Sequence, residues 1–432
     1  MALPCALHRA SPGCSIAGLP LDARLLNPVC ALVVLVSLGC ESRVQDAHQT
    51  MRRDSAGIEI VESGAPAWAA DEGWTLSAEP ELRIGVADGD SLYQFHQVRS
   101  AVFLDDGRIT VANSGTSTIR FYDGAGAFQH QSGGPGNGPG EFATLGPLTR
   151  LEGDSVAAYD FQLRRLTILS PAGKTARTVG FDVLQTPVPI GRPFRLSDGS
   201  YIAGGVGFSS QQLGPDSEPG LFRSDAPVFR IAPDARTVDT LGMFPGMEIA
   251  MRRTERGASF GPPPFGRNLH YFVLNDRIFI GTAVHFEVMV YTSDGLLERI
   301  IRGPASDLAI TPDRIAAHRD AMIELGEARG FDRAAIEADY EDLILPPARA
   351  AYDQMLVDDE GNLWLGTSDA GFLSAPRRWT IFAADGSLLG DLSVPERFRI
   401  LDVRDGKVLG VATDDLDIEY VHIHALERRE AA

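Results

Sequence analysis

Apolar and polar positions alternate in short runs between Asp-Gly turns along most of this chain. The stretch 101–142 shows the pattern clearly, as AVFLDDGRITVANSGTSTIRFYDGAGAFQHQSGGPGNGPGEF. Its runs over 101–106, 108–113, 118–123 and 128–132 have a period of two. Such alternation, bounded by Asp-Gly turns, is typical of antiparallel strands joined by tight hairpins. The pattern therefore predicts a four-stranded antiparallel unit.

The first turn of this unit recurs along the chain. It appears as DDGR, LEGD, SDGS, LNDR, DEGN and RDGK, centred on Gly107, Gly153, Gly199, Asp276, Gly361 and Gly406. The period is about 45 residues, with two longer intervals that carry insertions. Four strands repeated with this period predict an all-β fold, a six-bladed β-propeller of four-stranded antiparallel blades.

The last unit contains only three predicted strands. Near the N-terminus, segment 81–86 (ELRIGV) has the pattern of a fourth strand without three strands before it. An unpaired strand edge would expose backbone donors and acceptors. We therefore expect 81–86 to complete the sixth blade and close the ring. Segment 57–63 (GIEIVES) is a further candidate edge strand.

Three insertions interrupt the repeat, at 206–226 within blade three, at 245–268 between blades three and four, and at 303–350 between blades four and five. In an up-and-down blade, these positions lie at one end of the propeller, opposite the tight turns. We call it the insertion-bearing end. Functional loops gather on one side of a rigid scaffold, so this end is the expected working face. Drift in tolerated loops is the alternative explanation.

The third insertion has the signals of a helical hairpin. Thr311 is a candidate N-cap before Pro312, and Gly330 is a candidate helix end. A second helix is expected from Asp332 until the prolines at 346–347. This hairpin is either a lid over the propeller mouth or loop padding. The second insertion contains RRTERGASFGPPPFG, which has no helical period and predicts an extended loop.

The motif GPGEF at 138–142, followed by a strand, a turn with Gly and a second strand, resembles the NHL-type six-bladed propellers of the broader TolB-like class. The resemblance covers about residues 75–428, although GPGEF occurs in one blade only. The ending DDLDIEYVHIHAL and the segment LPPARA also resemble bacterial lipoprotein propellers of unassigned role.

The N-terminal segment is predicted to be a secretory signal. Its apolar run from Val29 to Gly39 is shorter than the roughly 20 residues that span a bilayer. The sequence Ser37-Leu38-Gly39-Cys40 resembles a bacterial lipobox, although Ser37 stands where Leu is usual. The resemblance implies lipidation of Cys40. Plain cleavage or a retained anchor are the alternatives.

These observations predict four segments. Residues 1–40 form the signal peptide, 41–56 a flexible tether, 57–428 the propeller with its helical insertion at 303–350, and 429–432 a C-terminal tail. All four cysteines lie within residues 1–40, so no disulfide is expected in the propeller. The net charge of −19 argues against binding to nucleic acid or to anionic headgroups, so membrane association would rest on the acyl chains.

Polar residues at strand ends on the insertion-bearing end are the candidate ligand-binding residues, because six strand ends converge at a propeller mouth. Each is also open to a purely structural role in the rim or between blades. Several arginines in an acidic protein would suit an anionic or carboxylate-bearing ligand. The candidates are His96, Asn113, Glu141, Asp160, Arg192, His270, Arg349, Tyr352 and Arg399.

A metal-dependent site is a weaker alternative. Gluconolactonase-type propellers hold a divalent cation with Glu, Asn and Asp, and Glu141, Asn113 and Asp160 have suitable oxygen ligands for Ca²⁺. No family motif maps onto them, so we expect no metal and no cofactor. Two histidines alternate on one strand, His422 and His424, but two ligands without a third favour packing over zinc. The glycines of 133–140 lack the Lys-Ser/Thr of a phosphate loop.

The sequence therefore predicts an exported lipoprotein of the cell envelope, in the periplasm or at the outer membrane. Its expected role is a non-enzymatic binding or scaffold module for a protein, peptide or glycan on the insertion-bearing end. The alternative is a hydrolase or lyase whose active site lies in the central funnel of the propeller, where the strand ends converge, with or without a divalent metal. The catalytic residues of such an enzyme are not identifiable.

Overall fold

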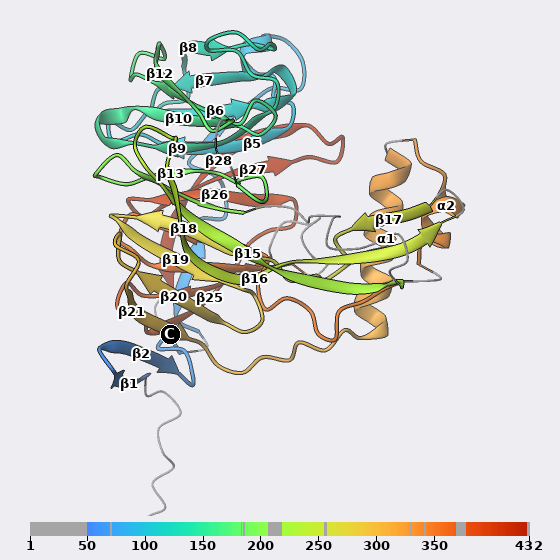
Figure 1. Cartoon of the computed structure of the whole chain (residues 1–432). Coiled ribbons are helices and arrows are strands. Elements are labelled where there is room, and N and C mark those ends of the chain that lie inside the picture. Colours follow the sequence, from blue (N-terminus) through green and yellow to red (C-terminus); the bar gives the residue numbers. More distant parts are fainter. Residues whose placement is uncertain are drawn as a thin grey trace, which may run out of the picture. The chain divides into compact units, whose positions relative to one another are not determined.

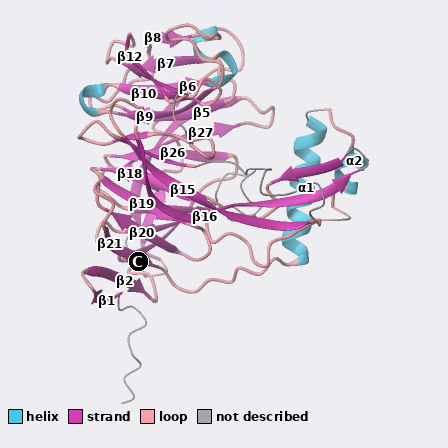
Figure 2. Ribbon diagram, viewed as in Figure 1, coloured by secondary structure: helices cyan, strands magenta, loops and turns pink. Residues whose placement is uncertain are grey.

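The chain folds into six β-sheets arranged as the blades of a propeller (Figure 1). The computed structural model describes residues 50–69, 71–182, 184, 186–205, 218–254, 257–328, 330–340, 343–368 and 377–429. The predicted signal peptide with Cys40, most of insertion 206–226 and the C-terminal residues 430–432 lie outside the described residues. Strands dominate, and both α-helices lie between two strand groups (Figure 2).

Each blade follows the predicted up-and-down order. Blade 1 contains β5 (Val98–Phe103), β6 (Ile109–Asn113), β7 (Thr118–Tyr122) and β8 (Phe128–Gly133). Blade 2 contains β9 (Leu145–Arg150), β10 (Val156–Asp160), β11 (Arg165–Leu169) and β12 (Thr175–Gly180). Blade 3 contains β13 (Phe194–Arg195), β14 (Tyr201–Gly204), β15 (Gly220–Ile231), β16 (Val238–Thr254) and β17 (Gly257–Gly261).

The remaining blades use N-terminal strands as well. Blade 4 contains β18 (His270–Leu274), β19 (Arg277–Gly281), β20 (Glu287–Tyr291) and β21 (Leu297–Arg302), together with β2 (Ile58–Ser63) and β1 (Thr50–Ser55). Blade 5 contains β22 (Gln354–Val357), β23 (Leu363–Thr367), β24 (Arg378–Phe382) and β25 (Leu388–Ser393). Blade 6 contains β26 (Phe398–Arg404), β27 (Lys407–Thr413) and β28 (Glu419–Arg429), together with β3 (Gly73–Leu76) and β4 (Leu82–Ile84).

The ring closes as the sequence predicts. β4 pairs antiparallel with β28, with Ile84 opposite Val421 and Leu82 opposite Ile423. β3 continues the pairing along the same strand, with Leu76 opposite Leu426. The strand that completes blade 6 therefore comes from the beginning of the chain, and no free edge is left beside this part of β28.

The apolar core is divided among the six interfaces between neighbouring blades. One buried cluster joins blades 6 and 1 and includes Ile84, Val98 and Val421. The others lie between blades 1 and 2, 2 and 3, 3 and 4, 4 and 5, and 5 and 6. Because every adjacent pair of blades shares such a cluster, burial of apolar surface holds the ring together.

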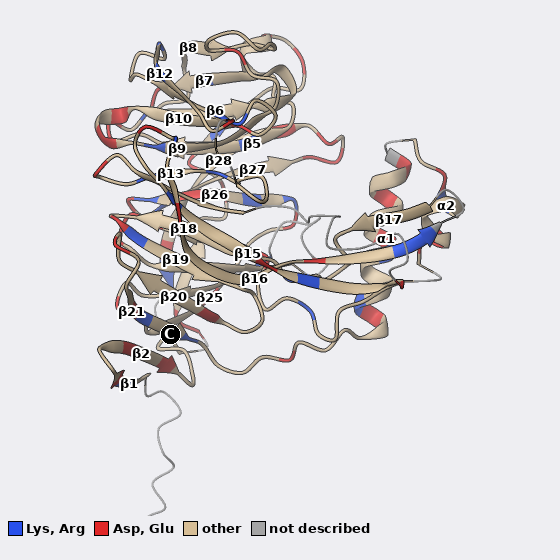
Figure 3. Cartoon of the chain, viewed as in Figure 1, with Lys and Arg blue, Asp and Glu red and all other residues tan. Residues whose placement is uncertain are grey.

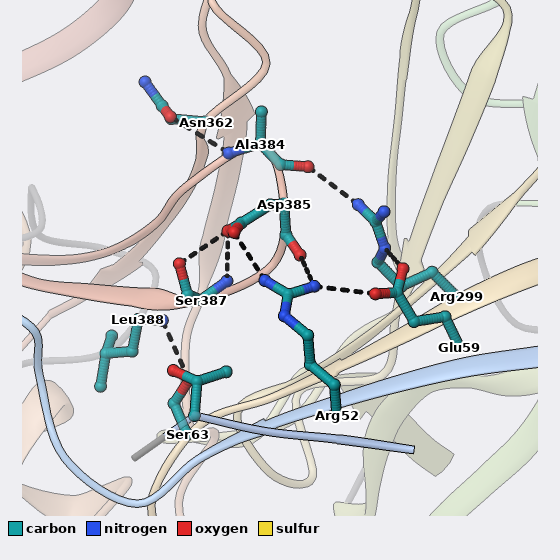
Figure 4. Close-up of polar contacts among 10 residues, drawn as sticks. Arg52, Glu59, Ser63, Arg299, Asn362, Ala384, Asp385, Ser387 and Leu388 are labelled. Atoms are coloured by element: carbon teal, nitrogen blue, oxygen red, sulfur yellow. Dashed lines mark hydrogen bonds and ion pairs between the residues drawn. The ribbon is translucent and has the colours of Figure 1, made fainter. Parts of the chain in front are cut away.

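The β1–β2 hairpin extends blade 4 and contacts blade 5, as Figure 4 shows. β2 pairs parallel with β21, which confirms that 57–63 contains an additional strand, but the edge of the sheet is β1. Arg52 Nη2 lies 2.6 Å from Asp385 Oδ2, and Arg52 Nη1 lies 2.8 Å from Glu59 Oε1. The Oγ of Ser63, which is buried, accepts a 3.0 Å hydrogen bond from the backbone N–H of Leu388. Part of the predicted tether 41–56 is thus the strand β1.

The second insertion is not an extended loop. β16 continues through Thr254, and β17 pairs back onto it, with Ala250 opposite Gly261 and Arg252 opposite Ser259. Figure 1 shows β15 and β16 as one long hairpin that leaves the blades beside the helices. The prediction was wrong because backbone pairing between the strands holds this segment, and this pairing requires no apolar alternation.

The third insertion is helical, as expected. α1 spans Pro312–Ala328 and α2 spans Arg333–Ala338. Thr311 Oγ1 accepts a hydrogen bond from Arg314 N at 3.3 Å, and Asp332 caps α2 through Ala334 N. α2 ends well before the prolines at 346–347. Within the described residues, no helix is long and apolar enough to cross a membrane.

Candidate functional site

The nine predicted site residues divide into three groups. One group builds loops of blades 1 and 2, a second lies between blades 4 and 5, and a third lies at the start of the inner strands of opposite blades. The groups contain, in that order, His96, Asn113, Glu141 and Asp160; His270, Arg349 and Tyr352; and Arg192 and Arg399.

Asn113 and Asp160 hold the loop that follows the second strand of their blades. Asn113 Oδ1 accepts the backbone N–H of His96 at 2.7 Å, and its Nδ2 donates to Thr116 at 2.9 Å. Asp160 accepts backbone N–H groups on both oxygens, from Ala143 at 2.8 Å and Leu163 at 2.8 Å among others. Both side chains are fully buried. Their oxygens are thus already occupied by protein donors.

Glu141 closes the Gly-rich bend of the GPGEF motif. Its Oε2 accepts the backbone N–H of Gly138 at 2.8 Å, and its carbonyl accepts a bond from Arg165. A Cβ at Gly136 would lie 2.1 Å from Glu141 Oε2, so the bend needs glycine there to admit the carboxylate. Within the described residues, no group of three or more His, Cys, Asp or Glu side chains is arranged to hold a metal ion.

His270 and Tyr352 meet where blades 4 and 5 join, with ring centroids 5.4 Å apart. The Tyr352 hydroxyl donates to the carbonyl of Glu287 at 3.1 Å, and burial raises the pKa of this hydroxyl. Burial lowers the pKa of His270 to about 4, and the charge of Arg223 adds to the shift. The buried Nε2 of His270 has no hydrogen-bond partner among the described residues. The imidazole is therefore neutral at pH 7.

Arg223 belongs to this group, although the sequence did not indicate it. It lies on β15 and donates to the carbonyls of Gly246 at 2.8 Å and Thr282 at 2.6 Å. Nearby, Glu248 is 1% exposed and accepts the Arg267 Nε at 2.8 Å. A buried carboxylate paired with a guanidinium in this way is held in one orientation. These residues join the β15–β16 hairpin to blade 4.

Asp353 is a second residue that the sequence did not single out, although it follows the predicted Tyr352 directly. Burial raises the pKa of its carboxyl to about 6, opposed by hydrogen bonds from Ser368 and by the charge of Arg349. Its Oδ2 accepts the Ser368 backbone N–H at 3.2 Å, whereas the buried Oδ1 has no partner among the described residues. The positive charge of Arg349 therefore favours the ionised form of Asp353 and lowers its pKa.

Arg192 and Arg399 precede or begin the inner strands of blades 3 and 6, which are opposite in a six-membered ring. Arg192 Nε donates to Thr149 Oγ1 at 3.0 Å, and its guanidinium lies 4.5 Å from the Phe194 ring centroid. Arg399 Nη2 donates to the Val98 carbonyl at 2.6 Å. Burial lowers the pKa of Arg192 to about 10, opposed by Tyr271 and Asp402. Both guanidinium groups are still cationic at pH 7.

The helical insertion contacts the extension of blade 3 and the loop between blades 5 and 6. Arg252, on the extension of blade 3, donates from Nη1 to the carbonyl of Asp339 at 3.2 Å. Arg397, between blades 5 and 6, forms an ion pair with Glu324 of α1 at 3.6 Å. The ring of Phe265 lies 5.3 Å from that of His318, which is hydrogen-bonded to Tyr340. The insertion therefore extends across the insertion-bearing end from blade 3 to the junction of blades 5 and 6.

Solved structures with the same architecture include proteins of unknown role and an enzyme. A member of the DUF4221 family from Bacteroides vulgatus matches with a TM-score of 0.52 and 13% identity, over 84% of this chain and 100% of that chain. A protein from Bacteroides fragilis, described as exported, matches with 0.47 and 11%, over 85% and 99%. A gluconolactonase from Xanthomonas campestris matches with 0.42 and 11%, over 82% and 100%.

No protein-family model and no curated protein sequence matches the chain. At such low identity, the structural similarity shows the fold alone. The chain is a six-bladed β-propeller, and its function has to be inferred from its own residues.

Proposed function

We propose that this chain is a binding module of the cell envelope that holds a protein, peptide or glycan at its insertion-bearing end. In this proposal the chain is a lipoprotein propeller with NHL- and TolB-like repeats, the class that its sequence resembles. The protein is exported and is attached to the membrane through an acylated Cys40. Replacing Cys40 by Ala is expected to move the protein from the membrane fraction to the soluble fraction. Retention in the membrane would contradict the lipid anchor.

One observation carries the proposed binding role. The helical insertion is attached to the extension of blade 3 through Arg252 and Asp339, and to the loop between blades 5 and 6 through Arg397 and Glu324. The second of these pairs is solvent-exposed, and exposed pairs contribute about 0–1 kcal/mol. A segment that extends across the insertion-bearing end and is held at one side by an exposed ion pair can open for a ligand at little cost, which favours the lid over loop padding.

The test deletes 304–345 and joins the ends with a short Gly-Ser linker. Parent and variant are compared on an array of envelope glycans and peptides, after circular dichroism and thermal unfolding have shown that both are folded. We expect the parent to retain a defined subset and the variant to lose it or to change its selection. Leu296→Ser, on an exposed tight turn, serves as the control.

Two results would count against the proposal. Equal retention by both proteins would mean that the insertion is padding. Absence of retention by the parent would favour a purely structural role. Metal analysis of the purified parent separates the enzyme alternative, because tightly held stoichiometric Ca²⁺ or Zn²⁺ would favour a metal-dependent hydrolase.

A further inference from the structure

Arg192 is a cation that the fold places on the inner side of the ring without an acid to neutralise it. Its Nε and Nη2 donate to Thr149 Oγ1 and to the Leu148 carbonyl, which are neutral acceptors. No described carboxylate forms an ion pair with it within 4.0 Å. Its backbone carbonyl accepts the Tyr271 hydroxyl at 2.8 Å, and this bond fixes the start of the strand.

The comparison with Arg267 shows what is missing. Arg267 is also partly exposed, and it is paired with the buried carboxylate of Glu248. Arg192 is partly exposed and surrounded by protein, and it stacks on Phe194. A guanidinium withdrawn from water without a counter-anion is unfavourable, so an anion that reaches it gains a strong charge-assisted interaction.

Asp402 is the one carboxylate with a described electrostatic effect on Arg192, and its own hydrogen bonds limit its role as a counter-ion. It lies on β26 of blade 6, and its Oδ2 accepts the Phe103 backbone N–H at 2.9 Å while its Oδ1 accepts that of Val403 at 3.1 Å. It interacts electrostatically with Arg150 and Arg404 as well as with Arg192. Asp402 therefore acts on Arg192 through its charge without forming an ion pair with it, and the same charge repels a second negative charge at this site.

We infer that Arg192 binds a carboxylate of the ligand, through the donors that Thr149 and Leu148 leave free, and that Asp402 disfavours dianions such as phosphate. This inference rests on the proposed binding function and specifies the chemistry of its ligand. A guanidinium presents five N–H donors, of which the protein uses one on Nε and one on Nη2. A planar carboxylate monoanion matches the remaining edge. The carboxylate belongs either to an acidic sugar or to a peptide.

The experiment compares four probes on the whole protein at fixed ionic strength: glucuronate, N-acetylalanine, glucose and inorganic phosphate. Isothermal titration calorimetry and thermal unfolding measure binding. We expect at least one carboxylate to bind, with glucose and phosphate weaker by about tenfold or more. Preference between glucuronate and N-acetylalanine tells which source supplies the carboxylate.

Arg192→Met removes the charge and is expected to weaken carboxylate binding by about tenfold or more, whereas Arg192→Lys keeps part of it. Arg195→Met changes an exposed arginine in β13, the strand that follows Arg192 directly, and is the matched control. If Arg192→Met does not fold, the inference is still tested by the preference of the parent for carboxylate probes over glucose and by the carboxylate binding of Arg192→Lys. Equal binding of glucuronate and glucose by the parent, or full binding by a folded Met variant, would overturn the inference. Loss of array binding on deletion of 304–345 would in that case leave the proposed function intact.

Discussion

Trp74 stacks on Trp364, with ring centroids 5.5 Å apart and ring planes inclined by 18°. Trp68 lies 5.3 Å from Trp74, and Trp379 lies 6.3 Å from Trp364. These are all four tryptophans of the chain. They connect the N-terminal segment that closes blade 6 to the core of blade 5. Tryptophan fluorescence therefore reports on ring closure.

Trp74→Ala is expected to destabilise the protein by about 2–4 kcal/mol, because it removes a stacked and partly buried indole from this cluster. Urea unfolding, followed by circular dichroism, measures the change. Trp74→Phe keeps an aromatic ring and should lose less. Equal stability of the Ala variant and the parent would mean that the pairing of β3 and β4 with β28 closes the ring without the stacked indoles.

The β1–β2 hairpin offers a test of buried against exposed polar contacts. Ser63→Ala removes the acceptor of the Leu388 N–H in a buried position, and we expect a loss of about 1–3 kcal/mol. Arg52→Ala removes exposed ion pairs to Glu59 and Asp385, and we expect a loss below about 1 kcal/mol. Chemical denaturation of both variants measures the difference. The reverse order of losses would show that the ion pairs fasten the hairpin.

Asp160→Ala is expected to cost about 3 kcal/mol or more, because several backbone N–H groups lose their acceptor together. The stability of the parent should not change with added Ca²⁺, since these oxygens are already engaged. Thermal unfolding with and without Ca²⁺ measures both. An Ala variant that matches the parent in the absence of Ca²⁺, combined with Ca²⁺-dependent stabilisation of the parent alone, would instead support the metal alternative.

His270 is expected to make the protein sensitive to acid. Burial holds its folded-state pKa at about 4, below the usual value of about 6.5. The unfolded chain therefore binds a proton that the folded chain does not. The contribution of His270 to stability is complete above about pH 6.5 and is lost as the pH falls toward 4, by up to about tenfold in the folding equilibrium per pH unit.

His270→Gln should remove this part of the pH dependence. Measuring the free energy of unfolding of both proteins at several values between pH 8 and pH 4 isolates the contribution of His270. The carboxyl groups of Asp353 and Asp402, whose pKa values are raised by burial to about 6, act in the opposite direction in both proteins. Parallel curves for parent and variant would contradict the assignment.

The blades could be predicted from sequence because most strands are short and many alternate in polarity and end in a turn that contains Gly. The closure by 81–86 could also be predicted, since one unit lacked a strand and one strand lacked a unit. The strand β1 could not be predicted from sequence, because its sequence TMRRDS has no apolar alternation. Its order depends on pairing with β2 and on contact between Arg52 and Asp385, residues 333 positions apart.

The candidate site was only partly predictable. The strand-end rule located Arg192, His270 and Tyr352, but it also selected Asn113 and Asp160, which hold loops. Sequence does not tell these apart, because both kinds of residue are polar and stand at strand ends. Asp402 was not selected, since it lies near a turn where Asp is ordinary. Its raised pKa arises from burial that exists only once the blades surround it.

The pairing of β4 with β28 also has a consequence for biosynthesis. The ribosome makes residues 82–84 long before their partners 421–423. During synthesis, the early strand must wait while five blades are made, and the ring can be sealed only after 421–423 have left the ribosome. Contacts of such long sequence separation form slowly. A nascent chain of this protein therefore carries an unsatisfied strand throughout translation, and factors that shield such strands would raise its yield.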